Sequence, residues 1–185
     1  MVESSTRRRC NENPSITAEA VESAENASKR MYRVEVALCL QQPDVDEAAL
    51  RQLAEYVLSA QNVADATISV ALVDSATMRQ LNQQYLQHDY DTDVLSFPFS
   101  EPDQPLDGEV IISPHYAAQA CHEFGTSLHQ EIGIYLIHGL LHLCGYRDDQ
   151  EPDRQQMHDR QSELWEQWVG SGMTLTTSKE NTHEG

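Results

Sequence analysis

The chain has 185 residues, 39% of them hydrophobic, which is enough for one domain with a substantial apolar core. Its formal net charge of −18 falls on the residues after position 30, and such an acidic body repels a phosphate backbone at long range. Any contact with nucleic acid must therefore depend on a local patch or on a partner protein. The longest apolar stretch is too short to cross a bilayer, and the four cysteines form no CxxC pair. We therefore expect a cytoplasmic protein with reduced thiols and no membrane association.

Composition divides the chain into three parts. Residues 1–30 and 171–185 are rich in polar residues, so they cannot bury enough apolar surface to offset the entropy of ordering. We predict a disordered N-terminal extension over 1–30, one folded domain over 31–170 and a disordered C-terminal tail over 171–185.

Strand and helix patterns alternate along the folded part. Alternating, β-rich stretches predict strands at 32–40, 66–73, 93–99 and 109–113. Capping residues predict helices that begin after Asp44, at Asp74 or Ser75, at Pro114, after Ser127 and at Pro152. This order predicts an α+β fold, a single domain in which a small mixed four-stranded sheet packs against several helices.

The helix predicted after Ser127 carries residues suited to binding a metal. From 132 to 144 it is apolar apart from Tyr135, His138 and His142, which indicates a buried central helix. The two histidines are four residues apart, so their rings lie on one face, about 40° apart, and can converge on one ion. Gly145 can end the helix in a left-handed conformation and so let Asp148 approach the same ion. The bland alternative is that each histidine is structural and held by a hydrogen bond, the commoner role of a bare HxxxH pair.

Longer motifs then indicate a family. The segment 138–146, HGLLHLCGY, resembles the signature HGxLHLxGYDH of the YbeY family of zinc-binding endoribonucleases. The segments TDVLSFP at 92–98 and GEVIIS at 108–113 resemble two further landmarks, and 78–85 resembles the segment M..LN..YR. The resemblance covers about residues 31–168.

The resemblance implies a single-strand-specific, metal-dependent endoribonuclease that acts in small-subunit ribosomal RNA maturation and in ribosome quality control. It implies one Zn²⁺ per chain, bound by His138, His142 and the residue that aligns with a third histidine, here Asp148. It also places Asp93, with Thr92 and Ser96, near the site. The implied partners are precursor ribosomal RNA, a small-subunit ribosomal protein and a ribosome-maturation GTPase.

The chain departs from the family pattern at two positions. Asp148 replaces a histidine, which leaves a His₂Asp set with an open fourth position, as in catalytic zinc sites. Leu86 replaces the arginine of the YR pair, and this removes a cation suited to phosphate. Arg147 can supply that cation, although an exposed loop arginine more often pairs with a neighbour such as Asp149. We therefore take Asp93 and Arg147 as catalytic candidates.

Two other functions remain open from the sequence. A non-catalytic, metal-binding ribosome-assembly factor is favoured by the missing arginine and by the acidic body. A metalloprotease is disfavoured, because its HExxH motif needs a glutamate where this chain has Gly139. The ligand set also suits iron, cobalt or manganese, so the residues alone leave the metal open.

Overall fold

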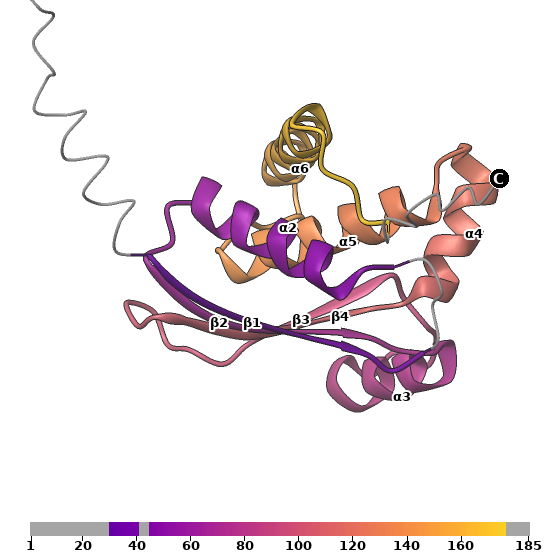
Figure 1. The fold of residues 1–185 in the computed structure, drawn as a ribbon. Helices are drawn as coiled ribbons and strands as arrows, with labels where there is room; N and C mark the ends of the chain where they lie inside the picture. The colour runs from indigo at the N-terminus through magenta and orange to yellow at the C-terminus, as the bar shows by residue number, and fades with distance from the viewer. Residues whose placement is uncertain (1–29, 41–44, 177–185) are drawn as a thin grey trace, which may run out of the picture. The chain divides into compact units, whose positions relative to one another are not determined.

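The computed structural model describes residues 30–40 and 45–176. The described elements, drawn in Figure 1, are β1 (Met31–Leu38), α2 (Glu47–Ala60), β2 (Asp65–Leu72), α3 (Ser75–Leu86), β3 (Val94–Pro98), β4 (Leu106–Ile112), α4 (Pro114–Phe124), α5 (Leu128–Leu143) and α6 (Asp153–Gly170).

The sheet is mixed, with the strand order β1-β2-β4-β3. Strands β1, β2 and β4 are parallel to one another, whereas β3 runs antiparallel to β4 and forms one edge. Short connections explain the arrangement, because only neighbouring antiparallel strands such as β3 and β4 can be joined without a crossover helix. The predicted α+β fold with a four-stranded mixed sheet is confirmed.

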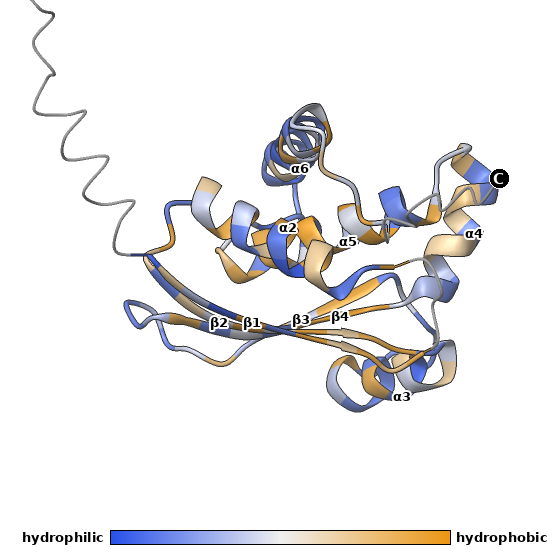
Figure 2. Ribbon diagram, in the orientation of Figure 1, coloured by the Kyte–Doolittle hydropathy of each residue, from blue (hydrophilic) through white to orange (hydrophobic). Residues whose placement is uncertain are grey.

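The helices lie in layers around this sheet. Figure 1 shows α2, α4, α5 and α6 on one side of the sheet and α3 on the other. Helix α5 contacts β3 and β4 on one side and α6 on the other, so it is the central helix of the body. Helix α6 is mostly hydrophilic in Figure 2, because as an outer element it buries only one stripe of side chains, Met157, Leu164 and Trp168.

Two glycines allow α5 to lie close to the sheet. A β-carbon at Gly139 would come within 2.6 Å of a methyl group of Val110 and 2.9 Å of Ser96 Oγ. A β-carbon at Gly108 on β4 would come within 2.9 Å of Leu143. The helix therefore runs antiparallel to β4, with glycine on one side of each contact.

Several boundaries differ from the prediction, and contacts with distant residues explain two of them. Strand β4 begins at Leu106 rather than at 109, because Gly108 pairs with Ile68 inside the sheet. The N-cap of α2 is Asp46, whose carboxylate accepts a hydrogen bond from the Ala48 amide at 2.8 Å, while the predicted cap Asp44 lies outside the described residues. The ordered body continues past 170, where Leu175 is 2% exposed and its carbonyl accepts a hydrogen bond from the Asp46 amide.

Residues 1–29 of the predicted extension over 1–30, and residues 177–185 of the predicted tail over 171–185, lie outside the described residues. Within the described part, no helix is long and apolar enough to span a membrane.

We expect Gly139→Ala to destabilise the protein by about 1–3 kcal/mol, the usual cost of overpacking a tight contact. The added methyl group must displace Val110 or move α5 away from the sheet. Gly170→Ala is the matched control, because it also lies in a helix but has no atom within 4 Å of the added β-carbon. Urea unfolding monitored by circular dichroism measures both variants, and equal free energies of unfolding would contradict this packing.

Candidate metal centre

The two histidines lie on one face of α5, near its C-terminal end. The helix begins at the predicted N-cap Ser127, whose hydroxyl accepts a hydrogen bond from the Gln130 amide. It ends at Leu143, and Gly145 then adopts a left-handed conformation with φ of 94°. This turn reverses the chain, as predicted, and brings Asp148 back to the histidines.

The three side chains form a compact triangle of ligand atoms. The Nε2 atoms of His138 and His142 are 3.1 Å apart, and Asp148 Oδ2 lies 3.5 Å from the first and 3.6 Å from the second. Four tetrahedral ligands at about 2.05 Å from a zinc ion would be about 3.3 Å apart, so these spacings fit one ion. Among the described residues, this is the one group of histidine, cysteine and carboxylate side chains close enough to hold a metal.

Hydrogen bonds fix the tautomers of both histidines. His138 Nδ1 donates to the side-chain oxygen of Gln161 at 2.9 Å, and His142 Nδ1 donates to the backbone carbonyl of Tyr146 at 3.1 Å. When a ring donates through Nδ1 in its neutral form, its lone pair lies on Nε2, and the two Nε2 atoms face each other at 3.1 Å. Such an arrangement is repulsive without a shared cation, and the outer hydrogen bonds are those that metal-binding histidines usually make.

The local electrostatics keep the site ready to bind a cation. Burial lowers the pKa of His138, and the neighbouring His142 lowers it further, so His138 is a neutral imidazole at neutral pH. Asp93 and Asp148 act in the opposite direction, which indicates negative charge close to the ring. A divalent ion would satisfy this negative charge and both lone pairs, so the residues present fit a metal.

Asp93 is held rigidly at the start of β3. Its Oδ1 accepts hydrogen bonds from Thr92 Oγ1 and the Val94 amide, both at 2.9 Å, and its backbone carbonyl accepts one from the Ser113 amide. Oδ1 takes both hydrogen bonds found for this carboxylate among the described residues, which leaves Oδ2 available. Ser96 faces α5 at Gly139 instead, and its enclosed hydroxyl has no hydrogen-bond partner within the described part of the chain.

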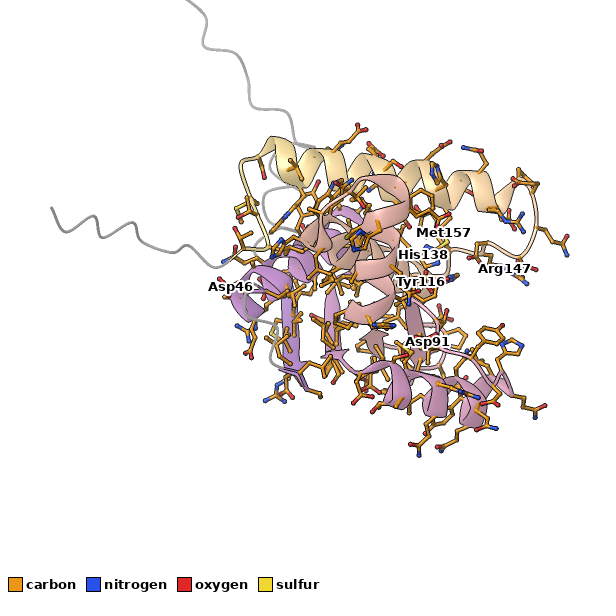
Figure 3. The ribbon with its side chains drawn as sticks, turned by 90° about the vertical axis from the view of Figure 1, so that its right-hand side faces the viewer. Asp46, Asp91, Tyr116, His138, Arg147 and Met157 are labelled. Carbon is orange, nitrogen blue, oxygen red and sulfur yellow. The ribbon has the colours of Figure 1, made fainter. Side chains whose placement is uncertain are left out.

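Arg147 lies further from the centre of the site. Figure 3 shows it on the connection between α5 and α6, further out than His138 and Met157. Its guanidinium pairs with Asp149 at 3.4 Å, and its side chain is 71% exposed. Leu86, at the end of α3, is also exposed. The structure thus brings His138, His142 and Asp148 together, with Asp93 nearby, and leaves Arg147 at the rim.

The model of the family described as Endoribonuclease YbeY matches residues 35–169. The chain belongs to this family. The Endoribonuclease YbeY of Salinibacter ruber is 38% identical over 128 residues, which are 65% of this chain and 82% of that protein. The Endoribonuclease YbeY of Mycolicibacterium gilvum is 36% identical over 139 residues, 68% of this chain and 78% of that protein.

The solution structure of TM1509 from Thermotoga maritima is similar in fold. It aligns with a TM-score of 0.56 and 26% identity, covering 75% of this chain and 91% of that one. The family match and the identities to the two curated relatives confirm the resemblance to the YbeY family seen in the sequence motifs.

The sequence analysis missed Gln161 and Arg154, which hydrogen-bond to the His138 ring and to the backbone of the loop that carries Asp148. Gln161 lies 23 residues after His138, and Arg154 donates to the backbone carbonyls of Asp148 and Asp149. Helical spacing from the buried Met157 would have placed both on the inner stripe of α6. No pattern in the sequence shows which ligand either one meets, because that depends on how α6 crosses α5.

We expect the purified YbeY-family chain to hold about one metal ion, as a three-ligand site implies, and a His138→Ala/His142→Ala variant to hold almost none. Asp148→Ala should reduce the metal content, whereas Asp149→Ala should not, because the Asp149 carboxylate pairs with Arg147. Mass spectrometry of metals after gel filtration gives the stoichiometry. The same metal content in the wild type and the double histidine variant would show that the site is misplaced.

Proposed function

We propose that this chain is a zinc-dependent endoribonuclease that cleaves single-stranded segments of precursor small-subunit ribosomal RNA in the cytoplasm. The observation that carries the proposal is the triangle of His138, His142 and Asp148, which offers three protein ligands and leaves further coordination positions to water or substrate. Membership of the YbeY family and the names of its relatives support RNA as the substrate.

When bound, the ion would polarise a phosphoryl oxygen and supply hydroxide near neutral pH. Asp148 adds one negative charge to the ligand set, which moderates this acidity compared with three neutral histidines. The Nδ1 atoms of the two imidazoles donate to uncharged acceptors, the side-chain oxygen of Gln161 and the Tyr146 carbonyl, so neither ring pairs with a second carboxylate through Nδ1.

Asp93 is the proposed proton acceptor. Thr92 and the Val94 amide hold Oδ1, which fixes the direction of Oδ2 without tying it to another side chain. A carboxylate fixed in this way can accept a proton from the attacking water or orient that water by a hydrogen bond.

The two alternative functions lead to different expectations. A non-catalytic assembly factor would bind metal and RNA without cleaving. The metalloprotease is physically disfavoured, because it needs a glutamate at position 139. A β-carbon at Gly139 would already lie 2.6 Å from a methyl group of Val110, so a glutamate side chain has no room there. A small-subunit ribosomal protein and a ribosome-maturation GTPase are proposed as partners, and the net charge of −18 suits basic ribosomal surfaces.

We expect Asp93→Asn to slow cleavage of a ribosomal RNA fragment with an unpaired segment by roughly 10²- to 10⁴-fold, the range for loss of a general base. The amide keeps the acceptor for Thr92 and Val94 but loses the charge, so metal content should not change. Asp91→Asn removes the same charge from the same loop, where Asp91 accepts a hydrogen bond from Ser75, and should cleave normally. Cleavage is followed on denaturing gels. An Asp93→Asn protein that cleaves at the wild-type rate would exclude this role, and a metal-loaded wild type that never cleaves would favour the assembly factor.

Arg147 is the proposed replacement for the missing family arginine. Arg147→Ala should reduce cleavage roughly 10- to 100-fold, as expected for one charged hydrogen bond to phosphate, with zinc content and melting temperature unchanged. Leu86→Arg in that background should recover part of the rate. The competing explanation is that Arg147 only forms an exposed ion pair with Asp149. Arg147→Ala would then cleave RNA at the wild-type rate, and this result would exclude a phosphate-binding role for Arg147.

A further inference from the structure

The inner stripe of α6 meets the metal ligands at two separate points. Arg154, Met157 and Gln161 have helical spacing and share this stripe, and Met157, 1% exposed, fixes it against the core. We propose that Arg154 and Gln161 are positioning residues, Arg154 for the loop that carries Asp148 and Gln161 for the ring of His138. The inference rests on the proposed metal site but not on RNA cleavage.

Arg154 ties the ligand loop to the first turn of α6. Its Nε donates to the carbonyl of Asp148 at 2.9 Å, and its Nη2 donates to the carbonyl of Asp149 at 3.2 Å. The planar guanidinium thus spans two consecutive carbonyls, which a lysine ammonium does not reproduce. This pair of bonds fixes the backbone from which the Asp148 carboxylate projects.

The loop needs such a tie because its own charges repel one another. Asp148, Asp149, Glu151 and Asp153 fall within six consecutive positions. Arg154 also lies 3.8 Å from Glu151, so it offsets part of this negative charge. Without it, repulsion would favour conformations that carry the Asp148 carboxylate away from the histidines.

Gln161 fixes the orientation of the first imidazole. Its side-chain oxygen accepts the Nδ1 proton of His138 at 2.9 Å, so Nε2 points at His142 and Asp148. Outer hydrogen bonds of this kind typically change metal affinity 10- to 100-fold when they are removed. Helix α6 therefore orients two of the three ligands, although it supplies none of them.

The test measures zinc affinity directly, by competition of the full-length protein with a chromophoric chelator in the absence of RNA. Arg154→Gln and Gln161→Leu should each weaken zinc binding roughly 10- to 100-fold. Arg154→Lys should recover only part of the loss, because it restores the charge but not the fork. Gln161→Glu should keep wild-type or tighter affinity, since its carboxylate also accepts the Nδ1 proton.

Two controls match these changes. Gln155→Leu makes the same substitution on the exposed side of α6, where Gln155 donates to Asp159. Arg79→Gln removes the same charge on α3, where Arg79 pairs with Asp89 of the following loop. Both should bind zinc like the wild type. The melting temperature of the metal-free protein should be nearly unchanged in Arg154→Gln, because the Arg154 side chain is 58% exposed, so a loss of affinity is not a loss of fold.

Wild-type zinc affinity in both Arg154→Gln and Gln161→Leu would overturn the inference. Wild-type zinc affinity in Arg154→Lys would show that the positive charge of Arg154 is sufficient and that its two guanidinium hydrogen bonds are not required. A wild type that binds no zinc would remove the metal centre and this inference together. Tight zinc binding with the expected losses, but without RNA cleavage, would leave the inference standing and refute the proposed function alone.

Discussion

The arrangement of the whole site depends on the close contact between α5 and the sheet. Gly139 on the helix and Gly108 on β4 remove the side chains that would keep the two apart. Gly139 contacts Val110, and Leu143 contacts Gly108. Four residues of a helix and two residues of a strand each advance about 6 Å, so both contacts can form at once. This match fixes the rotation of α5 about its axis.

With Gly139 facing the sheet, His138 and His142 are turned about 100° and 60° away from it, to the same side of the helix. They therefore leave the packed interface but stay beside the edge strand β3, where Asp93 stands. A larger residue at 139 would shift α5 outward and carry both histidines with it. Gly139, which leaves no room for a glutamate side chain, is thus also the residue that sets the positions of His138 and His142.

Local patterns predicted the parts of the site that lie close together in the sequence. Helical spacing placed His138 and His142 on one face of a helix, and the turn at Gly145 allowed Asp148 to approach them; the structure brings these three side chains together. Longer motifs added Asp93 through the family resemblance. The boundaries that differed, β4 at Leu106 and the body beyond 170, depend on partners far along the chain, namely Ile68 and the Asp46 amide. The outer partners Arg154 and Gln161 escaped prediction for the same reason, since only the packing of α6 on α5 determines what they touch.

Charge distribution bears on how such a site can meet RNA. Each arginine between positions 33 and 160 already has a partner in its own chain: Arg33 with Glu35, Arg51 with the Val34 carbonyl, Arg79 with Asp89, Arg147 with Asp149, Arg154 with the ligand loop and Arg160 with Glu163 and the Ala60 carbonyl. Binding to a phosphate backbone normally draws on several cations at once, and its strength falls steeply with salt for that reason. Among the described residues, an arginine that binds a phosphate must first give up its partner, as Arg147 would give up Asp149. The described part of the chain therefore offers few cations for direct binding of a phosphate backbone.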